Sequence, residues 1–141
     1  MKKSISIFMA VALLLLAALP VSAAQGGGTV LPMYMNANDV NMKFVIDENG
    51  IATIRVTGDG NNKCTGFYVV TYLEHWANNT WNRVNIGTAN NQWTYSTSQN
   101  MLLVTYNHTV TEAGEYRAVS RVLVYGTGQN ESILLTRVFE L

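Results

Sequence analysis

The sequence contains little cysteine, proline or charge, and each shortage excludes a class of protein. Cys64 is the single cysteine among 141 residues, so no disulfide can form within the chain. Both prolines precede position 33, and charged residues make up 13% of the chain against 48% for the hydrophobic class. This composition excludes a disordered or acidic-tail protein, because such chains are rich in charge and poor in apolar residues. The chain is therefore expected to fold around an apolar core.

The first 24 residues have the three zones of a secretory signal peptide. Lys2 and Lys3 form a positive start, an apolar run covers residues 5–19, and small residues end at Ala24. The run is shorter than the ~20 residues that a membrane-spanning helix needs, which favours a cleaved signal over an anchor. We expect cleavage after Ala23 or Ala24, a secreted extracellular product, and no membrane anchor after processing.

Acidic and basic residues are equally frequent, with nine of each. Removal of Lys2 and Lys3 with the signal leaves a net charge of −2 on the mature chain. Binding to nucleic acid depends on a basic surface that displaces counterions from phosphates, and a nearly neutral chain does not provide one. The sequence therefore predicts no nucleic-acid partner, and no motif in it indicates a cofactor.

Period-two alternation of apolar residues dominates the chain after position 40. Residues 25–40 begin Gln-Gly-Gly-Gly and are predicted to be a flexible or extended lead-in, and residues 41–141 are predicted to be the folded domain. Turn residues recur roughly every 8–12 positions without sustained helical periodicity, which is typical of an antiparallel β-sandwich or barrel. Asn49-Gly50 predicts a tight two-residue hairpin turn, because both residues accept a positive φ. The expected strands cover Asn41 to Asp47, Ile51 to Thr57, Gly66 to His75, Thr80 to Ile86, Trp93 to Ser96, Met101 to Val110, Glu115 to Tyr125 and Glu131 to Glu140.

One short motif narrows the fold class. Residues 111–118 read Thr-Glu-Ala-Gly-Glu-Tyr-Arg-Ala, and the Ala-Gly-x-Tyr pattern ending at Tyr116 resembles the entry to strand F of immunoglobulin-like domains. The resemblance implies a tyrosine corner, in which the Tyr116 hydroxyl bonds to backbone a few residues upstream. Ala118 stands where antibody domains have their second core cysteine, so the resemblance is to disulfide-free immunoglobulin-like or fibronectin-type sandwiches of about 7–8 strands. The chain also resembles small exported proteins of Gram-positive bacteria.

The sequence offers few residues for catalysis or metal binding. His75 and His108 are the only histidines, and both are interpreted as exposed strand residues near turns. Glu74 and His75 are adjacent in an expected strand, so their side chains point to opposite faces. The acidic segments Asp47 to Gly50 and Asp59 to Asn62 lack the ligand spacing of a calcium loop and fit ordinary turns. We expect neither a catalytic nor a metal site, and therefore no enzyme activity.

The aromatic residues are the best candidates for a binding site. Trp76, Trp81, Trp93 and Tyr95 lie close together in sequence beside turns rich in asparagine. Exposed rings can stack on sugar C–H groups while amides bond to hydroxyls, so these residues are candidates for a glycan platform. In the alternative interpretation, Trp76 and Trp81 flank a hairpin and only cover each other. We therefore expect a secreted, non-enzymatic module that binds a protein or glycan, or alternatively a self-associating extracellular structural or colonisation-related protein that pairs through an edge strand.

Overall fold

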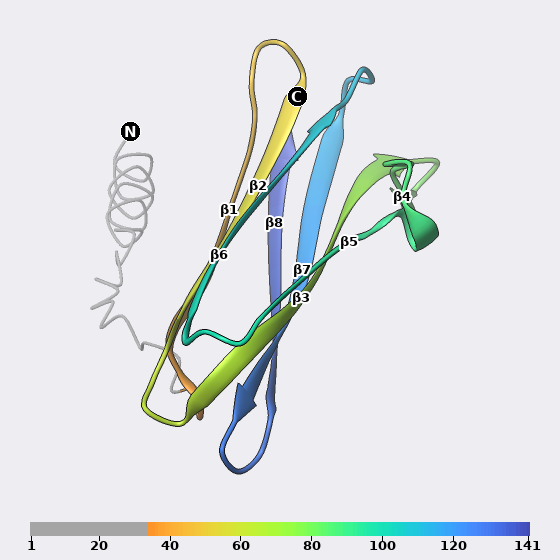
Figure 1. The fold of residues 1–141 in the computed structure, drawn as a ribbon. Helices are drawn as coiled ribbons and strands as arrows, with labels where there is room; N and C mark the ends of the chain where they lie inside the picture. The colour runs from red at the N-terminus through yellow and green to blue at the C-terminus, as the bar shows by residue number, and fades with distance from the viewer. Residues whose placement is uncertain (1–33) are drawn as a thin grey trace, which may run out of the picture. The chain divides into compact units, whose positions relative to one another are not determined.

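The computed structural model describes residues 34–141, so the predicted signal peptide and most of the predicted lead-in lie outside the described residues. The described chain is built from eight strands and one short 3-10 turn at Ala89–Asn91, and Figure 1 shows their course. Among these residues, no helix has the length and apolar character needed to cross a membrane. The strands are β1 (Ala37–Ile46), β2 (Ile51–Gly60), β3 (Cys64–Ala77), β4 (Thr80–Arg83), β5 (Trp93–Thr97), β6 (Met101–Thr109), β7 (Glu115–Gly126) and β8 (Glu131–Glu140).

The strands form two antiparallel sheets that pack against each other. One sheet has the order β1-β2-β6, and the other has the order β4-β3-β7-β8 with β5 also paired to β3. The first, second and fourth of the six long strands are in one sheet, and the other three are in its partner. This is the strand arrangement of an immunoglobulin-like sandwich. The all-β, immunoglobulin-like fold predicted from the sequence is therefore confirmed.

The core is formed by the inward-facing residues of both sheets. Ala52, Ile54 and Val56 alternate along β2 and are buried, as the sequence pattern predicts. On β3 the buried residues are Phe67, Val69, Thr71 and Leu73, so its even-numbered residues face outward. A disulfide is absent from this core. Instead two buried hydroxyls, Thr71 and Ser120, share a 2.7 Å hydrogen bond between neighbouring strands.

Several strands extend beyond their predicted bounds, and β1 and β2 do so by at least three residues at one end. β1 begins at Ala37, four residues earlier than expected, because Asn36 is buried and its amide donates to the carbonyl of Gln129 at 2.7 Å. β2 continues through Gly58 to Gly60, which the sequence predicts as turn. A side chain at Gly58 would lie 3.1 Å from the ring of Phe67, so glycine here allows close packing between the sheets.

The prediction of a two-residue turn at Asn49-Gly50 is wrong, because the turn found there is longer. Gly50 has a φ of +74°, whereas Asn49 is not among the residues with positive φ. The Gly50 N–H donates to the carbonyl of Asp47 at 2.9 Å, so the turn spans Asp47 to Gly50. The Asp47 carboxylate fixes this longer turn by accepting hydrogen bonds from the backbone N–H groups of Asn49 and Ile51. The result is a three-residue loop whose last residue is a left-handed glycine.

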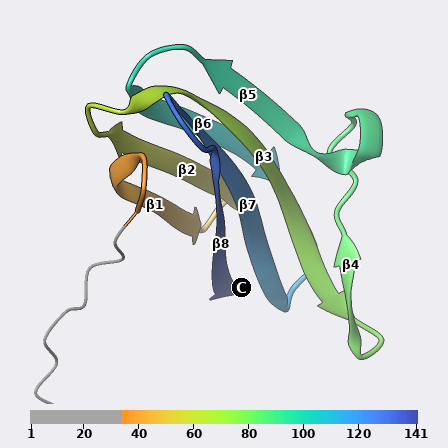
Figure 2. The same ribbon diagram turned by 90° about the horizontal axis from the view of Figure 1, so that it is seen from below.

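Strand β3 lies at the centre of the larger sheet and positions the candidate site. Along one edge it pairs with β7, and along the other it pairs first with β5 and then with β4 (Figure 2). β4 ends at Arg83, three residues before the predicted end, because Asn85 begins a turn in which its side chain accepts from the Gly87 N–H at 3.0 Å. The segment between β4 and β5 therefore leaves the sheet.

Candidate functional site

The outer faces of the two sheets differ in chemistry. The three-stranded sheet presents mainly polar side chains such as Lys43, Arg55 and Thr57, with exposed apolar residues at its ends. The five-stranded sheet presents aromatic, aliphatic and arginine side chains instead, with Trp76 39%, Leu134 62% and Val138 56% exposed. Apolar area on an outer sheet face commonly marks an interaction surface. The five-stranded sheet therefore carries the stronger candidate.

Aromatic rings and guanidinium groups alternate at the β4 end of this face. We call the group formed by Tyr72, Glu74, Trp76, Trp81, Arg83 and Arg117 the arginine–aromatic patch. The Arg83 guanidinium carbon lies 3.6 Å from the centroid of the Tyr72 ring, and that of Arg117 lies 4.4 Å from the Trp81 ring. Trp76 meets Trp81 edge to face, with 5.2 Å between centroids. Cation–π and edge-to-face contacts each stabilise such an arrangement by about 1 kcal/mol.

The register of the strands explains why these residues meet. Trp76 pairs with Trp81 across β3 and β4, and Glu74 pairs with Arg83 on one side and with Arg117 on the other. Residues that are paired across a sheet share a face, so the six side chains of the patch are brought together.

A tight hairpin fixes the register between β3 and β4. Asn78 and Asn79 connect the strands with φ angles of +56° and +60°. Positive φ at both central residues is the geometry of a type I′ hairpin turn, for which asparagine is well suited. The Asn82 amide donates to the carbonyls of Ala77 at 3.0 Å and Thr80 at 3.1 Å and closes the hairpin.

Positive charge exceeds negative charge at the centre of the patch. The Nε of Arg117 donates to the Glu74 carboxylate at 2.7 Å, and the two side chains are 29% and 12% exposed. Arg83 is on the same face and lies over the Tyr72 ring, not against a carboxylate. Glu74 therefore balances one of the two arginines of the patch, and the patch favours a partner that carries negative charge or hydrogen-bond acceptors.

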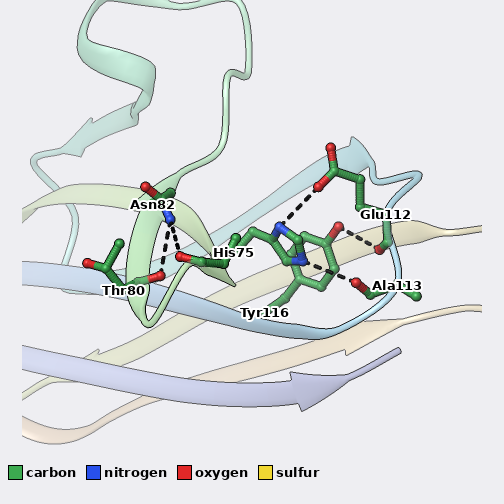
Figure 3. Close-up of polar contacts among 7 residues, drawn as sticks. His75, Thr80, Asn82, Glu112, Ala113 and Tyr116 are labelled. Carbon is green, nitrogen blue, oxygen red and sulfur yellow. Dashed lines mark hydrogen bonds and ion pairs between the residues drawn. The ribbon is translucent and has the colours of Figure 1, made fainter.

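A second cluster lies between the sheets, at the turn that enters β7 (Figure 3). The Tyr116 hydroxyl donates a 2.8 Å hydrogen bond to the carbonyl of Glu112, which is the geometry of a tyrosine corner. Burial, followed by the Glu112 charge, raises the pKa of Tyr116. Gly114 has a φ of +127°, a conformation that L side chains rarely adopt.

His75 is part of this corner and is not an exposed strand residue as the sequence suggests. Its side chain is 15% exposed, and its ring stacks on Tyr116 with 4.6 Å between centroids. Nδ1 lies 3.3 Å from the Glu112 carboxylate, and Nε2 lies 3.2 Å from the carbonyl of Ala113. Both ring nitrogens are thus occupied by structural contacts (Figure 3). Glu74 points to the opposite face, so the two neighbours do not act together.

A third feature is a groove at the edge of the sandwich, between β6 and the segment that joins β4 to β5. It has two hollows of about 350 and 430 Å³. The first extends from the tyrosine corner at His75 and Tyr116 to His108, and the second is bounded by Trp93 and Tyr106. The Trp93 ring stacks on Tyr106 at 5.1 Å and meets His108 at 6.4 Å, so these rings separate the hollows. We call this feature the edge groove.

Tyr106 is unusual within the edge groove. Its hydroxyl is the buried side-chain polar atom that has no hydrogen-bond partner among residues 34–141. Burial, followed by the nearby Tyr95, raises the pKa of Tyr106 to about 12. A buried hydroxyl without a partner is costly, and in native proteins it calls for a specific explanation.

The four aromatic residues selected from the sequence do not form one platform. Trp76 and Trp81 are on the outer face, as both interpretations of that pair allow, whereas Trp93 and Tyr95 face β6. The sequence analysis missed Arg83 and Arg117, whose roles depend on cross-strand pairing. It also missed Tyr106. The alternation of side chains along β6 could have placed this residue on the half-buried face of the strand. Among residues 34–141, no group of three or more His, Cys, Asp or Glu side chains could hold a metal ion.

Comparison with known proteins found a similarity in structure but none in sequence. No protein-family model matches the sequence, and no curated protein sequence is significantly similar to it. The fold is similar to the CARDB domain of the PF1109 protein from Pyrococcus furiosus, which was solved in complex with di-metal ions. The two share 20% sequence identity with a TM-score of 0.44, and the match covers 77% of this chain and 96% of the other.

Proposed function

We propose that this chain is a secreted, non-enzymatic binding module that acts by surface contact with a protein or a glycan, and that its protein ligand binds the arginine–aromatic patch. The observation that carries the proposal is the gathering of Tyr72, Trp76, Trp81, Arg83 and Arg117 on one outer sheet face. Tyrosine, tryptophan and arginine are the residues most enriched where protein interfaces derive their affinity.

The geometry of the patch favours a protein ligand over a sugar at this position. Guanidinium groups lie over the rings of Tyr72 and Trp81, so those ring faces are not available for stacking on a sugar. The same contacts hold the arginines in place, which lowers the entropy lost when they bond to a ligand. Trp76 is the most exposed ring of the group and is the expected centre of the contact.

Secretion and the lack of enzymatic activity are parts of the same proposal. The three zones of residues 1–24 support export, and N-terminal sequencing of protein from culture supernatant tests it. The engagement of both His75 ring nitrogens supports a non-enzymatic role, because a general base needs a free nitrogen.

Selection from a phage-displayed peptide library tests the protein-binding role. We expect enriched peptides to contain acidic and aromatic residues and to shift the amide NMR signals of β3, β4 and β7. Trp76→Ala should weaken their binding at least tenfold, whereas Thr105→Ala, an exposed change on the other sheet, should not. Peptides whose NMR shifts lie elsewhere, or that bind Trp76→Ala as tightly as wild type, would count against the proposal.

A second candidate function is self-association through β8. This ten-residue strand pairs with β7 along one edge only, and its outward residues Leu134 and Val138 are exposed. Long, apolar edge strands can pair with a second chain. Sedimentation at two concentrations tests this role. Leu134→Glu should abolish any dimer, and Met101→Glu, at a similarly exposed position on β6, is the matched control.

A further inference from the structure

Apart from Arg83, which also belongs to the arginine–aromatic patch, the edge groove has a lining of its own. Amide side chains project from the segment between β4 and β5, at Asn85, Asn90 and Gln92, and threonines from both sides complete the wall. Amides and hydroxyls can each donate and accept hydrogen bonds. They therefore match a ligand whose own groups do both, and sugar hydroxyls have that property.

The segment that carries these amides is held in place by its backbone. The Thr88 hydroxyl donates to the carbonyl of Gln92 at 2.7 Å and accepts from the Gln92 N–H at 3.1 Å. The carbonyl of Asn90 accepts from Arg83 at 3.2 Å. Since these bonds use backbone atoms of Asn90 and Gln92, they fix the loop without consuming the two side-chain amides.

The backbone of the loop has a defined conformation. Asn90 and Asn91 have φ angles of +57° and +48°, a left-handed conformation that asparagine accepts, as it does in the β3–β4 turn. Arg83 and Thr88 provide contacts that hold the loop in this conformation.

Aromatic rings provide the apolar wall of the groove. Trp93 and Tyr106 both line the larger hollow, and their rings are stacked nearly parallel, at 12°. A small number of polar groups placed beside aromatic rings is the usual composition of a small-molecule site. Each of the two rings covers one face of the other, so a sugar ring would pack on the remaining apolar surface of the pair while its hydroxyls reach the amides.

Formal charge is sparse in the groove. Arg83 and Glu112 are its formally charged lining residues among the described part of the chain, they have opposite signs, and both line the smaller hollow. The larger hollow, which holds Asn90, Gln92, Trp93 and Tyr106, is lined by uncharged residues. A ligand of that hollow meets no counter-charge and is therefore expected to be neutral.

We propose that the edge groove binds a neutral oligosaccharide, with the Asn90 and Gln92 amides bonding to its hydroxyls and a sugar ring packed against Trp93 and Tyr106. This inference rests on the proposed function in treating the chain as a binding module, and it specifies the glycan part of that function. Because Asn90, Gln92, Trp93 and Tyr106 are not part of the arginine–aromatic patch, each part can fail without the other.

Calorimetric titration and amide NMR with defined tetrasaccharides test the inference. The probes are cellotetraose, maltotetraose, xylotetraose and chitotetraose, and tetragalacturonic acid is the charged probe of equal length. We expect saturable binding of at least one neutral probe, with NMR shifts confined to residues 82–94 and 106–112. The charged probe should bind at least tenfold more weakly.

Four variants locate the binding site. Asn90→Gly removes an amide while tolerating the positive φ, and Gln92→Ala removes a second amide; each should weaken binding of the neutral probe at least tenfold without lowering the melting temperature. Thr105→Ala, on the opposite face of β6, and Trp76→Ala, in the patch, should change it less than twofold. The inference is overturned if no neutral probe binds, if tetragalacturonic acid binds equally well, if Trp76→Ala abolishes sugar binding, or if the library peptides displace the sugar from the groove.

Discussion

At the scale of single residues, Tyr116 carries the clearest link between sequence and fold. Its hydroxyl donates to the Glu112 carbonyl at a position that is half-shielded from water. Removing only the hydroxyl, by Tyr116→Phe, leaves that carbonyl without its partner while the ring still packs. We expect a loss of about 1–3 kcal/mol in the free energy of unfolding, measured by urea denaturation. For a domain of this size the melting temperature should fall by several degrees.

The control for this change follows from the structure. Arg117 is next in sequence, but its pairing with Glu74 and Trp81 makes it unsuitable as a neutral comparison. Tyr68 is better suited, because it is a half-buried tyrosine on the outward face of β3. Tyr68→Phe should cost less than about 0.5 kcal/mol. Equal losses at the two positions would remove the energetic case for a tyrosine corner.

Removal of the Tyr106 hydroxyl should have the opposite effect and stabilise the protein. Its buried hydroxyl has no partner among residues 34–141, so Tyr106→Phe should raise the free energy of unfolding at pH 7 by about 1 kcal/mol. If the edge groove binds sugar, the same variant also shows whether this hydroxyl contributes to the affinity. A clear loss of stability at pH 7 would mean that the hydroxyl bonds to ordered water.

The raised pKa of Tyr106 predicts a further effect at alkaline pH. The tyrosine titrates near 10.0 when unfolded and at about 12 in the native chain. The stability that depends on the protonated side chain is therefore fully present below pH 10 and is lost as the pH rises toward 12. Tyr106→Phe should flatten this decline in urea denaturation between pH 9.5 and 11.5. Part of the decline should remain, because the pKa of Tyr116 is also raised.

At the scale of secondary-structure elements, the β3–β4 hairpin determines whether the arginine–aromatic patch exists. Asn79 has a φ of +60°, a conformation that a β-branched residue adopts only with strain. Asn79→Val should disrupt the pairing of Trp76 with Trp81 and reduce the near-ultraviolet circular dichroism of the tryptophan pair. Global stability should fall by only about 1–2 kcal/mol, because β4 is a short edge strand.

Asn79→Gly is the matched control for the hairpin. Glycine accepts the same φ, so the spectrum and the stability should stay close to wild type. A normal tryptophan signal in Asn79→Val would mean that packing of Trp81 against Arg117, not the turn, fixes the position of β4.

The strands were predictable from the sequence, whereas the site was not. Alternation along β2 and β7 identifies buried residues without knowledge of their neighbours, and the motif ending at Tyr116 identifies the fold class. The contacts of Arg117 with Glu74 and Trp81 depend on which strands pair and in which register, and single-strand periodicity does not contain that information. The prediction of a two-residue turn at Asn49-Gly50 was wrong for a related reason, because hydrogen bonds to the Asp47 side chain stabilise the longer loop.

At the scale of the whole molecule, the two sheets divide the available surface into parts with different chemistry. The outer face of the five-stranded sheet has arginines and half-exposed rings, and the open edge has amides, hydroxyls and stacked rings. Both depend on the way β4 and β5 follow one another along β3 (Figure 2). In the proposed function, such a module binds a protein and a glycan at different surfaces, which share Arg83 but not Trp76, Asn90 or Gln92.

Substitutions of Trp76 and Trp93 test whether the two surfaces differ in their importance for stability. Trp76 is 39% exposed and contacts Trp81 by its edge, so Trp76→Ala should lower the free energy of unfolding by only about 1 kcal/mol. Trp93 packs against the apolar core and on Tyr106, so Trp93→Ala should cost about 3 kcal/mol. Urea denaturation measures both. The Trp76 side chain could then be removed while the protein stays folded, which a test of ligand binding at this position requires. Trp93, by contrast, joins the edge groove to the core. Similar large losses for both variants would show that the outer pair is structural, and would leave the arginine–aromatic patch without an anchor for a ligand.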